Sequence, residues 1–481
     1  MTNLEWWESV GYIILLFNIG CVLLIILRGR KSATATWAWI LVMLTLPLAG
    51  LMLYLLFGRE LKSERWNSAD APRTQLLMDM QQNSLSQGQL FQHSQGSRQK
   101  QELVHMLLHA NYSPLTEDNQ VELITDGKAK FDQLYEDIQA ARHSVYIQYY
   151  SIAPDEIGRP LIELLTKKAD EGLDVFLLYD GLGSIKLTKQ LLEPLRQAGG
   201  WAEPFFPLRS ALFKASLNHR NHRKLVIIDQ TTGYMGGFNI GRQYVKKTKK
   251  FGYWRDSHLR LRGGSVYLLQ DYFISDWNKG GPSSSLSADT TLPKIRQENG
   301  VAMQLVQSGP DMPRSQIKGG FLKMIQEADD YIYIQTPYFI PDLSLLESLR
   351  IAVLSGRDVR IMIPNKPDHL FVYWATSFFV GELLREGASV YMYEDGFLHA
   401  KTMVIDDHVS TLGTANMDIR SLRINFELNA FMYDQPTAHK MKSVFESDQA
   451  VCRELTWDEY QKRSAAVRMK ENFSRLLAPL L

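Results

Sequence analysis

The chain has 481 residues, of which 45% are hydrophobic and 22% charged, a globular composition that excludes a disordered or fibrous class. Its 53 basic and 52 acidic residues give a formal net charge of +1, whereas nucleic-acid binders usually carry a clear basic excess. The two cysteines, Cys21 and Cys452, cannot build a disulfide framework or a zinc site.

Two apolar stretches without charged residues come first, at residues 10–27 and 33–57. Each is long enough to cross a bilayer, which takes about 20 residues as a helix. The alternative for the first stretch, a secretory signal peptide, needs a basic segment before it, yet the charged side chains there are Glu5 and Glu8. The sequence therefore predicts a two-helix transmembrane hairpin over residues 1–60.

The orientation of this hairpin stays open, because basic residues in its loop and after its second stretch favour opposite sides of the membrane. Residues 61–111 are rich in Gln and Ser. This composition predicts a juxtamembrane connector that is partly helical.

From residue 112 onward, short apolar strands alternate with amphipathic helices, which predicts an α/β layered fold. The same order of elements occurs in residues 112–280 and again in residues 300–481. Between them, residues 281–299 form a linker rich in Gly, Ser and Pro.

Each half also contains nearly the same eight-residue motif. It reads HRKLVIID from His222 and HAKTMVID from His399, 177 residues apart (399 − 222). Five residue types recur in the same order and at identical spacings: His222, Lys224, Asp229, Gly236 and Asn239, then His399, Lys401, Asp406, Gly413 and Asn416. Side chains two apart on a strand share a face, so each histidine points the same way as its lysine. Each aspartate follows its histidine by an odd number of residues, so it lies on the opposite face of the strand or beyond the strand's end. This position favours a structural role over a place in the reacting group.

This doubled pattern resembles the paired HKD signature of the phospholipase D superfamily over nearly all of residues 112–481. The resemblance implies two phospholipase D-like α/β halves related by pseudo-two-fold symmetry, after the hairpin. It also implies a catalytic set, namely His222, Lys224, Asp229, His399, Lys401 and Asp406.

In such a site, a neutral imidazole attacks the phosphorus of a phosphodiester and forms a phosphohistidine. A second, protonated imidazole gives its proton to the leaving alcohol and later deprotonates the acceptor. The lysines supply positive charge, and we expect Asn239, Asn416 and Thr414 to contact the phosphate. In relatives with two unlike halves the N-terminal histidine attacks, so the resemblance assigns attack to His222 and acid–base work to His399.

A histidine in such a site usually has its other ring nitrogen held by a carboxylate. Asp256 follows His222 by 34 residues (256 − 222), and Glu427 follows His399 by 28 (427 − 399). The resemblance implies that these acids orient the histidines; the alternative is that they are exposed carboxylates on strands. No His/Asp/Glu cluster shows a metal-ligand spacing, so we expect a site without metal or other cofactor.

Several stretches are similar to bacterial cardiolipin synthases: LPLAGLMLYLLFGR, IQTPYFIP, YEDGFLHAKTMVID, GTANMDIRSLRINFELN and SRLLAPLL. The resemblance implies an enzyme that transfers a phosphatidyl group from one phosphatidylglycerol to another and releases glycerol. It also implies a multi-pass protein of the bacterial plasma membrane. The alternative is a membrane-bound phospholipase D, in which water resolves the same intermediate. The hairpin and the near-zero charge argue against a nuclease of the superfamily, and the doubled catalytic set argues against a non-catalytic scaffold. Oligomeric state and acyl preference stay open.

Two further features have open alternatives. For the aromatic stretches WAEPFFPLRSALFKASL and FVYWATSFFVGELL, one interpretation is that they line an entrance for acyl chains, and the other is that they pack in the core. The basic run at residues 246–250 is a solvated loop or contacts anionic headgroups.

Overall fold

The computed structural model describes residues 12–13, 16–23, 26–27, 33–46, 49–54, 58, 71–86, 98–111, 113–206, 218–280, 285–287, 300–312 and 314–478. The chain divides into two compact units. One comprises Met1–Lys62 and Phe206–His219, and the other comprises Ser63–Phe205 and Arg220–Leu481.

The smaller unit includes helices α2 (Ala33–Thr45) and α3 (Ala49–Leu53). Helix α2 ends two residues before Pro47, which has no N–H to continue a helix and whose ring clashes with the preceding turn. A Cβ added at Gly50 would lie 2.8 Å from the carbonyl oxygen of Val42. Helix α3 therefore packs closely against α2.

The two membrane-spanning helices predicted at residues 10–27 and 33–57 are not supported by this unit. Within the described part of the chain, no helix is both long enough and apolar enough to cross a membrane. The second stretch is divided near Pro47 into α2 and α3, and the first lies partly outside the described residues. The Asn18 side-chain amide donates to the carbonyl oxygen of Met43 (3.0 Å), so parts of the two stretches do contact each other.

The larger unit begins with helices α4 (Pro72–Ser86) and α5 (Arg98–Asn111), within the stretch predicted as a partly helical connector. Helix α4 is held by Asp271, whose carboxylate accepts the backbone N–H and the hydroxyl of Thr74 (both 2.9 Å). Helix α5 is held by the side-chain amide of Gln304, which donates to the carbonyl oxygen of Val104 (3.2 Å). Both helices therefore belong to the α/β unit, while the exact domain boundaries predicted from the sequence stay a prediction.

The two halves of this unit contain corresponding elements. The first half comprises β1 (Leu115–Ile124), α6 (Gly127–Ala140), β2 (Ser144–Tyr149), α7 (Gly158–Asp170), β3 (Asp174–Asp180), α8 (Lys189–Gln197), β4 (Trp201–Phe205), β5 (Leu225–Ile228), β6 (Thr232–Gly236), the 3₁₀ turn η3 (Arg242–Tyr244), β7 (Trp254–Arg255), β8 (His258–Arg262) and α10 (Gly264–Gly280).

The second half comprises β9 (Val301–Ser308), α11 (Gln316–Glu327), β10 (Tyr331–Gln335), β11 (Phe339–Ile340), α12 (Leu343–Leu354), β12 (Asp358–Pro364), α13 (Leu370–Glu386), β13 (Ser389–Tyr393), β14 (Phe397–Leu398), β15 (Thr402–Ile405), β16 (Val409–Gly413), β17 (Met417–Asp418), α14 (Ile419–Arg423), β18 (Glu427–Met432), α15 (Gln435–Gln449), β19 (Cys452–Leu455), α16 (Trp457–Gln461) and α17 (Ala465–Leu476).

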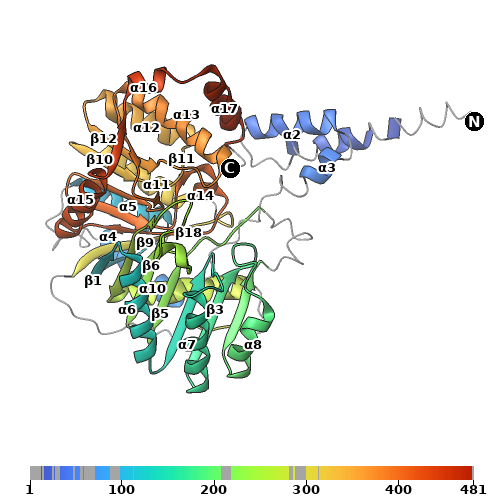
Figure 1. The fold of residues 1–481 in the computed structure, drawn as a ribbon. Helices are drawn as coiled ribbons and strands as arrows, with labels where there is room; N and C mark the ends of the chain where they lie inside the picture. Colours follow the sequence, from blue (N-terminus) through green and yellow to red (C-terminus); the bar gives the residue numbers. More distant parts are fainter. Residues whose placement is uncertain are drawn as a thin grey trace, which may run out of the picture. The chain divides into compact units, whose positions relative to one another are not determined.

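The described strands of the two halves join into one 15-stranded mixed sheet (Figure 1), in the order β19-β13-β12-β10-β15-β16-β18-β9-β1-β8-β6-β5-β2-β3-β4. Outward from the central antiparallel pair β1–β9, the first seven strands of each half follow in matching order. Strands β2, β3 and β4 are parallel, and β2 and β3 are rich in apolar residues and almost entirely buried, as is typical of parallel strands covered on both faces. The predicted α/β fold with two related halves is confirmed by this arrangement.

Each half buries a core between its sheet and its first helices. In the first half, Leu134, Ile138, Leu165 and Leu192 of α6, α7 and α8 are fully buried. In the second half, α11, α12 and α13 supply the corresponding apolar side chains. Burying each such side chain stabilises the fold by roughly 1.5–3 kcal/mol, so this layer makes a rigid base for the loops at the strand ends.

Candidate active site

The two repeated motifs meet where the halves exchange backbone hydrogen bonds. The N–H of His222 donates to the carbonyl oxygen of Phe426 (2.9 Å), and the N–H of Phe426 donates to that of Arg220 (2.8 Å). The second motif repeats the arrangement, because β14 pairs with β7 and the N–H of His399 donates to the carbonyl oxygen of Arg255 (2.7 Å). Each histidine is thus attached to the segment just before the other half's predicted acid.

This exchange pairs each histidine with a carboxylate of the opposite half. The Nδ1 atom of His222 lies 2.9 and 3.0 Å from the two carboxylate oxygens of Glu427. The Nδ1 atom of His399 lies 2.5 Å from Oδ2 of Asp256. Both predicted acids therefore contact histidines, but across the halves, which spacing within one half could not reveal. Since Nδ1 is occupied in both rings, Nε2 is left to meet a substrate.

Burial and neighbouring charges set the protonation of these groups. Burial lowers the pKa of His222, and it lowers that of His399 to about 4, with nearby lysines adding to both effects. For Glu427 and Asp256, burial alone would raise the pKa, but the contact with the facing histidine and the charge of a buried lysine outweigh it and hold both pKa values low. The site without substrate thus contains neutral imidazoles against ionised carboxylates.

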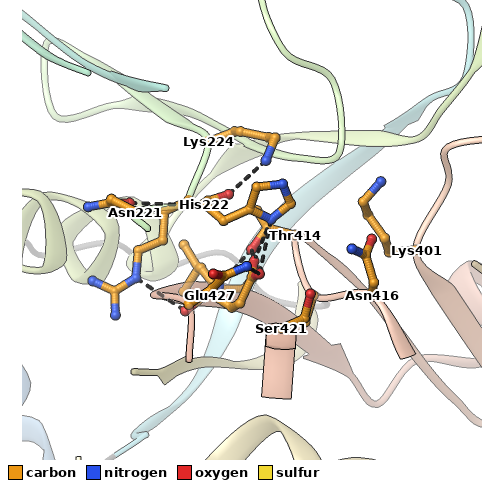
Figure 2. Close-up of polar contacts among 12 residues, drawn as sticks. Asn221, His222, Lys224, Lys401, Thr414, Asn416, Ser421 and Glu427 are labelled. Atoms are coloured by element: carbon orange, nitrogen blue, oxygen red, sulfur yellow. Dashed lines mark hydrogen bonds and ion pairs between the residues drawn. The ribbon is translucent and has the colours of Figure 1, made fainter. Parts of the chain in front are cut away.

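Two buried lysines surround these rings. The Nζ of Lys224 donates to the carbonyl oxygen of His222 (2.7 Å), and the Nζ of Lys401 donates to that of His399. Burial lowers the pKa of Lys224 to about 7 and that of Lys401 to about 8, and each lysine lowers the pKa of His222. Figure 2 shows both amines around the His222 ring, with the Asn416 amide beside Lys401. This concentration of positive charge favours binding of an anion.

The two orienting acids have different surroundings. Glu427 also accepts the hydroxyl of Thr414 and the side-chain amide of Asn425 (3.2 Å). Thr414 was predicted to contact phosphate; it is fully buried, and its hydroxyl is directed to Glu427. Asp256 instead lies beside Gly237, where an added Cβ would be 2.0 Å from Oδ1 of Asp256. The carboxylate therefore occupies the space that a side chain at position 237 would need.

We expect Gly237→Ala to displace Asp256 from His399 and to lower kcat by about 100-fold, the typical effect of misplacing a reacting group by about 1 Å. Steady-state kinetics measure this loss. Thr414→Ser is the matched control at the equivalent position, because it keeps the hydroxyl on Glu427 and should retain most of the activity. An unchanged kcat in Gly237→Ala would contradict the role of this close approach.

The repeated asparagines are buried beside the motifs. The side-chain oxygen of Asn239 accepts the N–H of Ser151 (3.3 Å), and its amide donates to the hydroxyl of Tyr244 (3.3 Å). The amide of Asn416 donates to Asp418 (3.1 Å). Their contact with phosphate stays a prediction.

The repeated aspartates hold backbone turns and do not contact the histidines. Asp229 accepts the N–H groups of residues 142, 143 and 144 at 2.7–2.9 Å, and Asp406 accepts those of residues 329, 330 and 331 at 2.6–2.9 Å. Their φ angles are +49° and +48°, which Asp tolerates better than most residues. The three N–H groups outweigh partial burial and lower the pKa of Asp229. Although both belong to the predicted catalytic set, their contacts fit the structural role that their odd spacing indicated.

We expect Asp229→Ala to lower the free energy of unfolding by about 1–3 kcal/mol, because it leaves three N–H groups without their acceptor. Thermal unfolding measures this loss, and turnover per folded molecule should stay near the wild-type value. Asp170→Ala, at an exposed site near the end of α7, is the control and should change neither quantity. A large loss of turnover with unchanged stability would instead place Asp229 in the reaction.

Several site residues were not predicted from the sequence. The ring of Tyr150 lies edge-on to His222 (centroids 5.0 Å apart), and the ring of Trp254 lies 5.1 Å from His399. Arg223, between the first histidine and lysine, is fully buried, donates to the carbonyl oxygen of Glu427 (3.1 Å) and pairs with Asp276. Single aromatic or charged residues without a repeated partner carry no sequence signal that separates them from the core.

The other predicted features are placed only in part. In the described ranges no group of three or more His, Cys, Asp or Glu could hold a metal ion. Of the basic run, Lys246 pairs with Glu156 (2.9 Å) at the surface. The aromatic stretch before the first motif lies largely outside the described residues, and the second forms most of α13.

Comparisons with known proteins show the family and the fold of this chain. The family described as cardiolipin synthase, PLD-like domain, matches residues 134–277 and 321–449, and a phospholipase D-nuclease N-terminal family matches residues 16–59. The chain is 47% identical to the major cardiolipin synthase of Bacillus subtilis over 97% of this chain and 98% of that one. It is 46% identical to cardiolipin synthase 2 of Staphylococcus epidermidis over 97% and 96% of the two chains. The crystal structure of a Haemophilus influenzae phosphatidylserine synthase shares the fold (TM-score 0.61, 15% identity, 80% and 99% of the two chains).

Proposed function

The chain belongs to the cardiolipin synthases of the phospholipase D superfamily, and from this premise we propose that it transfers a phosphatidyl group between two phosphatidylglycerol molecules. One observation carries the proposal. Two neutral imidazoles from different halves, each held at Nδ1 by a buried carboxylate, share a site with two buried lysines. This arrangement suits a phosphodiester, because it offers a nucleophile, a proton carrier and compensation for the anionic oxygens.

In the first step, Nε2 of His222 attacks the phosphorus of the donor lipid, and the P–O bond to the headgroup glycerol breaks. His399 gives that glycerol oxygen a proton. Since the bound phosphodiester is an anion, it favours the protonated form of His399 that this step requires. Both imidazoles are neutral before substrate binds, so the choice of His222 as nucleophile rests on the family resemblance.

In the second step, His399 removes the proton from a glycerol hydroxyl of a second phosphatidylglycerol. That oxygen bonds to phosphorus, the P–N bond to His222 breaks, and cardiolipin is released. One phosphodiester replaces another, so the reaction needs no nucleotide. If water took the acceptor's place, the product would be phosphatidic acid, which is the outcome expected for the alternative, a membrane-bound phospholipase D.

We further propose that the apolar N-terminal unit attaches the enzyme to the membrane that contains its substrate. Large apolar side chains there are exposed, including Leu16 (68%), Trp37 (71%), Leu41 (63%) and Met52 (68%). Several large apolar side chains exposed in one small unit are typical of contact with lipid or with another protein.

Incubation of the purified full chain with phosphatidylglycerol alone tests the proposed function. We expect cardiolipin and glycerol in equal amounts, identified by mass spectrometry of the lipids and by a glycerol assay. Phosphatidic acid with glycerol would support the hydrolase instead. Absence of any phospholipid product would remove the lipid assignment.

The lysine pair also predicts that the reaction needs no divalent cation, since Lys224 and Lys401 supply the charge that a metal ion provides elsewhere. Prolonged dialysis against a strong chelator should leave the initial rate unchanged. A loss of rate that is restored by one added metal would show that the positive charge of the lysines is not sufficient.

A further inference from the structure

Helix α17, near the end of the described chain, exposes a face that is both apolar and basic. Met469, Phe473 and Leu476 are 69%, 55% and 69% exposed, and their spacing places them along one side of the helix. The exposed charged residues of this fully described helix are all cations, Arg468, Lys470 and Arg475. Its single acidic residue, Glu471, is 2% exposed and turned inward to Ser377 (2.6 Å) and Arg463 (3.1 Å).

The neighbouring helix α13 extends this face. Leu370 and Phe371 at its beginning are 64% and 53% exposed, and the Phe371 ring lies 6.4 Å from that of Phe473. Farther along α13, Trp374 and Phe378 lie under Lys470 (5.3 Å) and Arg475 (4.8 Å). No charged residue occurs from Leu370 to Gly381. Together these residues form one apolar–basic face, called here the α13–α17 face.

The α13–α17 face begins two residues after a carboxylate that acts on Lys401. Asp368, two residues before α13, accepts the hydroxyl of Tyr338, and its charge raises the pKa of Lys401 against the larger lowering effect of burial. Leu370 and Phe371 follow directly. The opposite side of α13 packs against β11 and Ile419, so the helix is anchored to the body while its outer side is open.

We propose that the α13–α17 face docks the catalytic unit on an anionic bilayer. The apolar side chains would enter the bilayer just below the headgroups, where the acyl chains begin, and the three cations would contact lipid phosphates. The charge pattern of α17 carries the choice of partner: its exposed charged side chains are all cations and lie beside aromatic and aliphatic side chains, which matches an anionic lipid surface. The contact would be separate from attachment through the N-terminal unit and would present the site beside Asp368 to lipid headgroups. It deepens the proposed function, on which it rests for the identity of the substrate.

A fluorophore that responds to its surroundings tests the contact directly. It is attached after Phe473→Cys in the full chain, with Cys21→Ser and Cys452→Ser to remove the native thiols. The protein is reconstituted in vesicles of phosphatidylglycerol and phosphatidylcholine with brominated acyl chains. We expect bromine to quench this label and aqueous iodide to leave it largely unquenched. A label attached after Leu354→Cys, at a site 65% exposed on α12, should show the opposite pattern.

Equal iodide quenching of both labels would overturn the proposal. So would protection of the first label in lipid-free detergent that increases with protein concentration, because a second copy would then cover the face.

A kinetic comparison adds an independent readout. Joint replacement Met469→Ser, Phe473→Ser and Leu476→Ser should lower the rate on vesicles about tenfold or more, while the rate on monomeric short-chain phosphatidylglycerol stays the same. The control, Ile351→Ser with Leu354→Ser, alters side chains 62% and 65% exposed beside the ion pair of Glu347 and Arg350 and should change neither rate. Equal losses on both substrates would contradict docking. If the wild type made no cardiolipin from either substrate, the proposed function would fail while the label experiment still decided the docking.

Discussion

Replacement of His399 by alanine is expected to abolish cardiolipin formation, with a loss of about 10⁴-fold or more, and yet to leave an enzyme that forms a phosphohistidine. The variant lacks the proton carrier that glycerol needs for departure. A phosphatidyl ester of p-nitrophenol, a leaving group that departs without protonation, bypasses that need. We therefore expect one rapid release of p-nitrophenolate for each site, and an adduct on His222 that mass spectrometry at alkaline pH detects.

The matching variant, His222→Ala, should release no such burst and carry no adduct, because the attacking nitrogen is gone. His408→Ala, in an exposed turn, is the control and should behave as the wild type. An adduct on His399 in the His222→Ala variant would reverse the two roles. The experiment is decisive because both rings are neutral before substrate binds, so neither protonation nor the nearly symmetric contacts distinguish them.

The repeated motifs made much of this site predictable. A histidine and a lysine that recur at one spacing in two halves are hard to explain by packing. The structure places both pairs where the two halves exchange backbone hydrogen bonds. The pairing of His222 with Glu427 was not predictable, since it depends on a backbone exchange between the halves rather than on distance along the chain. Along the chain, the nearer of the two motif histidines to Glu427 is His399, whereas in the fold Glu427 contacts His222.

Hydropathy was a weaker guide than the motifs. It registers the apolar content of residues 33–57 but not that proline cannot continue a helix, so it predicted one span where the described residues form two short helices. The stretch that forms α13 stayed open between an acyl-chain entrance and the core for a related reason. Its aromatic residues are shared between the core and the surface, and only the packing shows which side each takes.

Glu427→Gln is expected to lower kcat by about 10³–10⁴-fold without removing any side chain from the site. The carboxylate accepts hydrogen bonds from His222, Thr414 and Asn425 at once, whereas an amide has one accepting oxygen and a nitrogen that can only donate. An amide nitrogen facing Nδ1 of His222 would force that atom to accept. The proton would then sit on Nε2, the atom that must attack phosphorus.

The same change should move the pH profile in a defined direction. Burial lowers the pKa of Lys224 to about 7 and that of Lys401 to about 8, and the charge of Glu427 keeps both values from being lower still. Without that charge both lysines would hold their protons only at lower pH, so the pH at which the rate declines on the alkaline side should decrease. Glu471→Gln removes a carboxylate that is 2% exposed and contacts Ser377 and Arg463 in place of a histidine, and it should change stability without this shift. A loss of rate with an unchanged pH profile would mean that Glu427 acts on the shape of the site and not on its charge.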